Sequence, residues 1–184
     1  MDIFKKTSKE GTVTLVDPAM ADNGSLYSIF DMDYVNAMKN LCKQADYILP
    51  NITEACFLTG TEYRTEYDRE YIDTLLSKFV DLGCKNVVLT GVSYGEETTG
   101  VVVYEQGEYR YYEHPLLPNS CHGTGDIYAS AFVGAFVRGN SAYEAAKIAA
   151  EYTMECIKIT ADIPNHWYGA AFEPALPKLI DLLK

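Results

Sequence analysis

The sequence predicts an α/β protein, a three-layer sandwich with a mostly parallel sheet. Short apolar runs rich in β-branched residues alternate along the chain with longer segments of helical periodicity, which is the pattern of repeated βα units. The 184 residues, 48% of them hydrophobic and 22% charged, suffice for one globular core and are too few for two ordinary domains. Residues 1–184 are therefore expected to form a single domain.

The first elements follow the order strand, helix, strand. The opening apolar run, TVTLV, ends at Asp17-Pro18, because proline cannot continue a strand ladder. The predicted elements are a strand at 12–16, a loop of turn-forming residues at 21–24, a helix at about 32–43 and a short buried strand at 47–49.

The second half opens with the clearest helix of the sequence. From Glu70 onward apolar residues recur at four-residue steps as far as Val80, and Gly83 follows at the position of a left-handed helix cap. The remaining predictions are strands at 86–90, 98–104 and 109–113, the last two joined at Gln106-Gly107, and helices at 127–137, from Ser141 with Glu144 as a capping box to about 158, and at 174–183.

The start of the chain conflicts with a complete parallel sheet. Only about ten residues precede the strand at 12–16, too few for a preceding βα unit, so the fold is expected to lack N-terminal strands. We expect 12–16 to be an unpaired edge strand beside apolar surface, which favours self-association.

Composition excludes several function classes. The formal charge of -11 and the lack of a Lys/Arg cluster argue against a nucleic-acid partner. No apolar run reaches the roughly 20 residues of a membrane span, and the N-terminus has no secretory core, which predicts a soluble, cytoplasmic protein. Free thiols rather than disulfides or zinc ligands are expected, since no CxxC pair or metal-ligand histidine spacing occurs among Cys42, Cys56, Cys84, Cys121, Cys156, His114, His122 and His166.

The segment HGTGD directly precedes the apolar helix. Gly123 and Gly125 would let backbone N–H groups approach an anion at the positive end of the helix. Asp126, in the first turn, could accept a proton from an attacking hydroxyl beside a bound phosphoryl group. In the alternative, Thr124 or Asp126 only caps the helix and the glycines form a turn. Neither a Walker loop nor a complete GxGxxG is present.

Three further polar groups follow predicted strands. Asp17 and Asp22 could bind Mg²⁺ on phosphates, or belong to a solvated acidic turn. Asn51 and Glu54 have the spacing of a capping box, and the alternative places them beside phosphate and a hydrated metal. Thr90 could offer its hydroxyl to a polyphosphate or end its strand.

Together these four groups indicate one site. Three lie at or just beyond strand ends and the fourth opens a helix, so in a parallel sheet all four would converge on one crevice. Independent caps and turns give no reason for such convergence.

Four segments carry a resemblance to a known family. They are DPAMADNGSLY (17–27), ADYILPNITEACFLTG (45–60), NVVLTG (86–91) and HGTGDIYASAFVGA (122–135). In order and spacing they resemble the ribokinase-type small-molecule kinases, most closely the pyridoxal (pyridoxamine) kinases, over nearly the whole chain from Gly11. The resemblance implies a ribokinase-like fold and an ATP-dependent kinase that phosphorylates the 5′-hydroxymethyl group of pyridoxal, pyridoxine or pyridoxamine in pyridoxal 5′-phosphate salvage.

The resemblance also implies roles for individual residues. Asp126 would be the catalytic base and would lie against the substrate. The remaining roles are an anion hole from Gly123, Thr124 and Gly125; a nucleotide-phosphate contact from Thr90; a cluster organising Mg²⁺, phosphate and potentially a monovalent cation from Asp17, Asp22, Asn51 and Glu54; and a nucleotide neighbour in Tyr27. The resemblance implies small-molecule partners only, namely the B6 vitamer and ATP, and it is compatible with a homodimer.

The sequence departs from the family pattern in two places. The usual DPVMGD reads DPAMAD, and Ala21 would resist any positive φ that the glycine supplied. The N-terminal portion with the first strands, the lid and most ring contacts has no counterpart, so the chain resembles the ATP-side part of a kinase. Asp126 favours a pyridoxal kinase over hydroxymethylpyrimidine kinases, which resemble HGTGC there. The alternatives are a kinase for hydroxymethylpyrimidine, another heterocycle or a sugar, or an inactive nucleotide-binding fragment.

Overall fold

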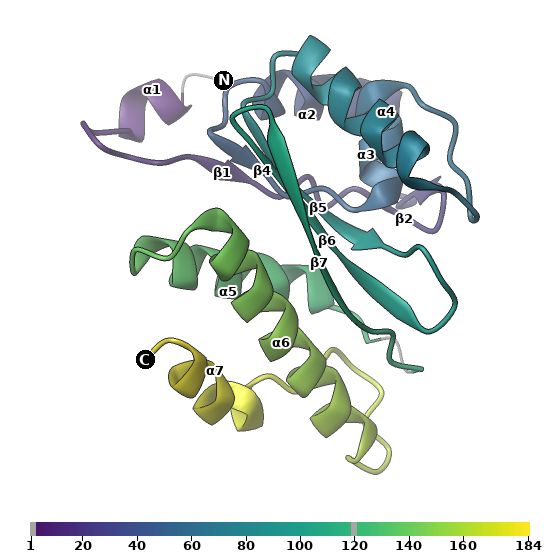
Figure 1. Ribbon diagram of the computed structural model, residues 1–184, viewed down its shortest axis with the longest axis vertical. Helices are drawn as coiled ribbons and strands as arrows, with labels where there is room; N and C mark the ends of the chain where they lie inside the picture. The colour runs from purple at the N-terminus through teal and green to yellow at the C-terminus, as the bar shows by residue number, and fades with distance from the viewer. Residues whose placement is uncertain (1–2, 119–120) are drawn as a thin grey trace. The chain divides into compact units, whose positions relative to one another are not determined.

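A five-stranded sheet in the order β1-β4-β5-β6-β7 organises the computed structural model, which describes residues 3–118 and 121–184 (Figure 1). Its strands are β1 (Leu15–Val16), β4 (Tyr47–Ile48), β5 (Asn86–Val92), β6 (Thr98–Glu105) and β7 (Glu108–Pro115). β4 pairs in parallel with both β1 and β5. A two-residue turn with positive φ at Gln106 and Gly107 joins β6 to β7, as in a tight hairpin. The predicted α/β class is confirmed.

The chain divides into two compact units. The first comprises Met1–Tyr94 and Val102–Arg110, and the second comprises Gly95–Val101 and Tyr111–Lys184. The hairpin strands β6 and β7 are each shared between them. Each unit is described by itself below.

Three of the helices of the first unit begin at side-chain caps. Its helices are α1 (Ile3–Thr7), α2 (Met32–Cys42), α3 (Ile52–Thr59) and α4 (Arg69–Asp81). Asp31, Asn51 and Asp68 each accept a hydrogen bond from the backbone N–H three residues on, which begins α2, α3 and α4. After α4, Gly83 has φ +87, as predicted for a left-handed cap. In Figure 1, α2, α3 and α4 lie together beside β4 and β5.

A small hairpin replaces the loop that was predicted at 21–24. β2 (Ala21–Asp22) pairs antiparallel with β3 (Ser25–Leu26), and Asn23 and Gly24 form the turn with φ of +49 and +77. Ala21 does not adopt a positive φ, in agreement with the expectation that alanine would resist one: it is buried in β2, and the preceding residue with positive φ is Ala19, at +35. Ala21 instead pairs with Leu26, which requires an extended backbone.

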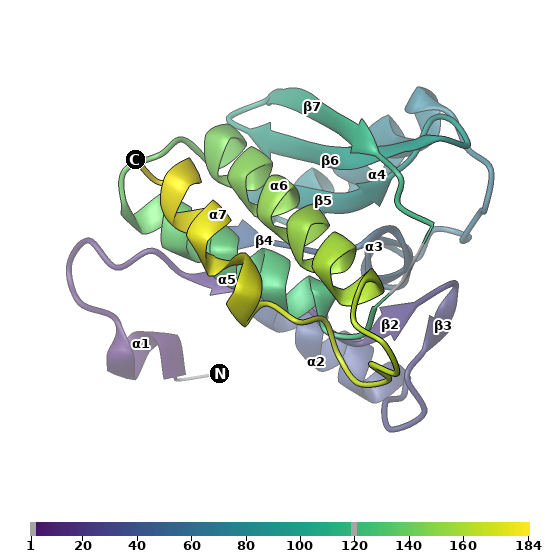
Figure 2. The same ribbon diagram turned by 90° about the horizontal axis from the view of Figure 1, so that it is seen from below.

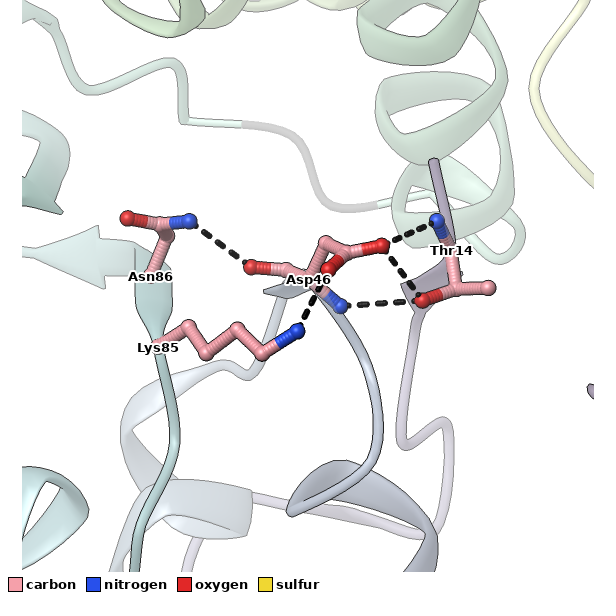
Figure 3. Close-up of polar contacts among 4 residues, drawn as sticks. All are labelled: Thr14, Asp46, Lys85 and Asn86. Atoms are coloured by element: carbon pink, nitrogen blue, oxygen red, sulfur yellow. Dashed lines mark hydrogen bonds and ion pairs between the residues drawn. The ribbon is translucent and has the colours of Figure 1, made fainter. Parts of the chain in front are cut away.

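A polar cluster connects β1, β4 and β5 at their first residues (Figure 3). The Asp46 carboxylate accepts hydrogen bonds from the Thr14 N–H and hydroxyl, both at 2.9 Å, and forms an ion pair with Lys85 at 2.7 Å. The Asn86 side chain donates to the Asp46 carbonyl at 2.9 Å. Because the Thr14 N–H binds a side chain, the paired strand begins at Leu15 and not at residue 12 as predicted.

β1 is the end strand of the sheet that the described residues form, as predicted. Of its flanking apolar residues, Val13 is 44% exposed, whereas Val16 is buried. The apolar surface along this edge is therefore smaller than the five-residue strand predicted at 12–16 suggested.

The second unit is a helical layer built on small residues. It contains α5 (Thr124–Val137), α6 (Ala142–Ala161), a short 3-10 turn at Glu173–Ala175 and α7 (Leu176–Leu182). Alanines let α5 and α6 approach closely, namely Ala131 and Ala135 on α5 and Ala142, Ala145, Ala146 and Ala149 on α6, all buried. Figure 2 shows α7 lying along α6. Ser141 begins α6 and accepts from the Glu144 N–H at 3.2 Å, as predicted.

The described residues were also compared with the predictions about membrane spans and cysteines. Within 3–118 and 121–184, no helix combines the length and hydrophobicity that crossing a bilayer requires. In the same ranges all five cysteines carry free thiols, in agreement with the prediction.

Candidate active site

Glu54 lies at the centre of the polar groups in the first unit. Its Oε2 accepts from the Asn51 N–H and Asn51 Oδ1 accepts from the Glu54 N–H, both at 2.9 Å, which completes the predicted capping box. Its other oxygen, Oε1, accepts from the Met20 N–H at 2.9 Å. One carboxylate therefore connects the start of α3 with the segment that follows β1.

Burial makes the ionised form of this carboxylate costly. Glu54 is 3% exposed, and burial raises its pKa from 4.5 to about 7, with a smaller contribution from the nearby Asp17 carboxylate. The hydrogen bonds from the backbone of Asn51 and Met20 oppose this rise. A positive charge on a bound cation would favour the ionised form.

The β2–β3 hairpin is held on α3 by two further hydrogen bonds. Asn51 Nδ2 donates to the Ala21 carbonyl at 2.8 Å, and the Gly24 N–H donates to Thr53 Oγ1 at 3.0 Å. Asp22, exposed at the end of β2, accepts from the N–H and side-chain amide of Asn23. The fold thus places Asp22 close to Asn51 and Glu54.

Thr90 lies beside Asn51 across two neighbouring strands. The two residues form a parallel bridge, and the Thr90 N–H donates to the Pro50 carbonyl at 2.9 Å. The prediction that the strand ends at residue 90 was wrong, because β5 continues to Val92 and includes Gly91 at φ +72. The structure therefore brings together Asp17, Asp22, Asn51, Glu54 and Thr90 at the carboxyl ends of β1, β4 and β5, and Tyr27, 47% exposed, follows on the hairpin.

The carboxylates fit a cation that a bound ligand carries. Among the described residues no group of three or more Asp, Glu, His or Cys side chains could hold a metal ion. Mg²⁺ on a polyphosphate retains waters and needs only one or two carboxylates. Asp17, half-buried, and Asp22, exposed, can supply them, while both oxygens of Glu54 already accept backbone hydrogen bonds.

The HGTGD segment forms the start of α5 in the second unit. Gly123 is the N-cap at φ +84, and no side chain of the described residues caps the helix. The alternative in which Thr124 or Asp126 caps the helix is therefore wrong, and Thr124 Oγ1 instead donates to the Cys121 carbonyl at 3.4 Å. Asp126 is exposed in the first turn, where the helix dipole favours negative charge.

The two glycines of this segment have different structural requirements. Gly123 needs the left-handed region, whereas Gly125 has an ordinary helical φ. A Cβ added to Gly125 would meet no atom of the described residues within 4 Å. Neither backbone conformation nor packing within the described chain requires a glycine at 125.

Sequence reasoning missed several residues that support the site. Thr53, Tyr63 and Tyr67 contact the hairpin or the segment after Thr90. Thr53 lies in the segment 45–60 without having been assigned a role, and the two tyrosines lie outside the four segments of the resemblance. The dipeptide Asn23-Gly24 was the available signal for the hairpin, since it favours a two-residue turn.

A groove of about 480 Å³ lies elsewhere in the first unit, between α4 and the β6–β7 hairpin. It contains none of the site residues that the sequence predicted, and its lining is Asp73, Leu76, Ser77, Val80, Asp81, Tyr104, Gly107 and Tyr109. The side chains with candidate chemistry lie in two places that are described separately, the strand ends of the first unit and the start of α5 in the second unit.

The resemblance implied that a chain with these strand-end polar groups and this glycine-opened helix belongs to the ribokinase-like class of α/β proteins. Comparison with known families confirms this class. The model of the phosphomethylpyrimidine kinase family matches residues 2–170, and the chain belongs to that family.

Individual relatives carry two kinds of name. The chain is 28% identical over 152 residues to the pyridoxal kinase of Dictyostelium discoideum, covering 75% of this chain and 49% of that protein. It is 25% identical over 151 residues to the hydroxymethylpyrimidine/phosphomethylpyrimidine kinase of Bacillus subtilis, covering 81% of this chain and 55% of that protein.

A solved structure matches closely. The crystal structure of a phosphomethylpyrimidine kinase from Bacteroides thetaiotaomicron, in a form with pyridoxal, has a TM-score of 0.89 and 30% identity. It covers 97% of this chain and 64% of that chain. The chain spans about half the length of the curated relatives it matches.

Proposed function

We propose that the protein transfers the γ-phosphoryl group of ATP to the 5′-hydroxymethyl group of a B6 vitamer such as pyridoxal. The observation that carries this proposal is the start of α5, where Asp126 is exposed in the first turn behind two glycines and an uncapped helix end. Membership of a kinase family supports the reaction type.

Asp126 would act as the general base. Its carboxylate accepts the hydroxyl proton while the substrate oxygen attacks the γ-phosphorus, and the bond from that phosphorus to the β-phosphate oxygen breaks to release ADP. The backbone N–H groups at Thr124, Gly125 and Asp126 point to the positive end of α5 and would stabilise the oxygens of the transferred group.

The first unit would hold the nucleotide phosphates. Thr90 and Asn51 offer a hydroxyl and an amide, and Asp17 and Asp22 hold the waters of a phosphate-bound Mg²⁺. When bound, Mg²⁺ neutralises charge that develops on the phosphates. Glu54 would fix the segment between Asp17 and Asp22 through its hydrogen bond from Met20. We also include Tyr27 as a neighbour of the nucleotide, because it is exposed next to the hairpin.

Two observations bear on the substrate. Aspartate at 126 favours a B6 vitamer, and the similar Bacteroides thetaiotaomicron structure was determined with pyridoxal. The second candidate is hydroxymethylpyrimidine, favoured by the family model and by the Bacillus subtilis relative. Both substrates present a hydroxymethyl group on a planar heterocycle, so the reaction type is the same for either and the choice between them has to be measured.

The test compares the two substrates with the protein expressed from its complete gene. ADP release would be measured with Mg·ATP and either pyridoxal or hydroxymethylpyrimidine, and binding of a non-hydrolysable Mg·ATP analogue would be measured in parallel. We expect a higher kcat/KM for pyridoxal. A higher value for hydroxymethylpyrimidine would overturn the substrate assignment, and analogue binding without turnover of either would identify a nucleotide-binding protein instead.

A further inference from the structure

One connection in the first unit contacts two segments of the candidate site. Residues 60–68 join α3 to α4 and carry Tyr63 and Tyr67. Tyr63 lies against the β2–β3 hairpin, and Tyr67 lies against the end of β5. The hairpin carries Asp22, and β5 carries Thr90.

The Tyr67 hydroxyl bridges two backbone groups immediately after Thr90. It donates to the Gly91 carbonyl at 3.2 Å and accepts from the Ser93 N–H at 3.0 Å. Gly91 has φ +72, a conformation that gives β5 an irregular end. The Tyr67 ring is placed by stacking on Tyr71 of α4, with ring centroids 5.3 Å apart. Because the Tyr67 ring stacks on a residue of α4, its hydroxyl holds Gly91 and Ser93, the segment that follows Thr90, in place.

The Tyr63 ring covers the hairpin turn. A Cβ added to Gly24 would lie 2.7 Å from Tyr63 Cδ1, so the hairpin backbone lies directly on the ring. The Gly24 N–H also donates to Thr53 Oγ1 at 3.0 Å. The hairpin thus has its own supports, and the Tyr67 hydroxyl has a separate role at β5.

We propose that Tyr67 is a positioning residue for nucleotide binding, acting through Gly91 and Ser93 on Thr90. This inference rests on the proposed function, in which Thr90 contacts the nucleotide phosphates. Without the hydroxyl, the Gly91 carbonyl and the Ser93 N–H lose a shared partner and the residues after Thr90 gain freedom. Ordering them would then weaken nucleotide binding and leave binding of the heterocycle unchanged.

The experiment compares Tyr67→Phe with Tyr47→Phe in the protein expressed from its complete gene. Tyr47→Phe is the control for loss of a tyrosine hydroxyl in the same unit, because the hydrogen bond that it removes is to Glu105, which is not a site residue. We expect Tyr67→Phe to raise the Kd of a non-hydrolysable Mg·ATP analogue about three- to tenfold, with an unchanged Kd for pyridoxal. Tyr47→Phe should change neither.

The outcomes separate the inference from the function. Equal analogue affinity in wild type and Tyr67→Phe overturns the positioning role alone, and so does an equal loss in both Phe variants. No analogue binding by the wild type overturns the proposed function and this inference together. If Tyr67→Phe does not fold, hydrogen exchange of the wild type decides: the analogue should slow exchange of the Gly91 and Ser93 amides, and unchanged exchange contradicts the proposal.

Discussion

At the scale of single residues, Gly125 is a glycine that neither backbone conformation nor packing within the described residues requires. Its φ is helical and the space that a Cβ would enter holds no atom of the described residues. The conformational freedom of glycine is therefore a cost to helix stability at this position. In the proposed function, a phosphoryl group that approaches this backbone would account for that cost.

Gly125→Ala should stabilise the fold and impair phosphoryl transfer. Removing a helical glycine gains up to about 1 kcal/mol, while the new methyl group lies where the transferred phosphoryl group would approach. Gly134→Ala is the matched control, since Gly134 is in the same helix with equally open surroundings. Both variants should melt at a higher temperature, and only Gly125→Ala should lower kcat. Full activity in Gly125→Ala would refute the anion hole.

Glu54 gives the protein a pH-dependent stability of unusual sign for a carboxyl group. Its pKa is raised, so the folded chain binds a proton more readily than the unfolded chain between pH 4.5 and about 7. Stability contributed by this group is therefore present at low pH and is lost as the pH rises through that window.

Glu54→Gln should remove this dependence. The measurement is the free energy of unfolding by denaturant across the window from 4.5 to about 7, without metal or nucleotide. The free energy of unfolding of the wild type, relative to that of the variant, should fall as the pH rises. Parallel pH profiles would mean that Glu54 ionises at its ordinary pKa.

At the scale of elements, the polar cluster of Figure 3 holds the edge strand β1 in register. Asp46 supplies one oxygen to Thr14 before β1 and the other to Lys85 before β5. Lys85 and the Thr14 N–H lower the pKa of Asp46 below its ordinary 3.8. The contribution of this carboxylate is thus present above that value and is lost as the pH falls through the lowered pKa.

Asp46→Ala should cost more stability than Lys85→Met. The first change leaves the Thr14 N–H and hydroxyl without their acceptor, at about 1–3 kcal/mol, whereas an exposed ion pair contributes about 0–1 kcal/mol. Denaturant unfolding at about pH 7 and about pH 3 should show the two variants closer together at the lower pH. If both variants lose the same free energy of unfolding at neutral pH, the cluster contributes through its surface ion pair alone.

The elements were predictable in proportion to their periodicity. The apolar steps of α4, the box at Asn51 and Glu54 and the cap at Ser141 each depend on residues three or four apart, and the structure confirms them. The β2–β3 hairpin was missed because strands of two residues have no period. Tyr67 was missed because its partners are more than twenty residues away in the sequence.

The candidate site was likewise predictable from the sequence only in part. Asn51 and Thr90 could be placed side by side from the rule that parallel strands align their carboxyl ends, and the structure confirms it. The sequence HGTGD did not predict that α5 begins without a side-chain cap, because Thr124 and Asp126 are both residue types that often cap helices. The catalytic roles themselves came from the family resemblance and stay predictions.

At the scale of the whole molecule, the candidate groups fall into two compact units. The first carries the strand-end cluster of Asp17, Asp22, Asn51, Glu54 and Thr90, and the second carries the start of α5. In the proposed reaction the first binds the nucleotide phosphates and the second receives the transferred group.

The most direct test of this account is the rate of pyridoxal-dependent ADP release by wild type and Asp126→Asn, measured on the protein expressed from its complete gene. The account predicts a fall in kcat of about 10²–10⁴-fold in the variant, because a proton acceptor is lost with little change of shape. Analogue binding should persist, and Asp162→Asn, a change at the exposed end of α6, should have no effect on the rate. A variant at position 126 that retains more than about a tenth of the wild-type kcat would contradict the account.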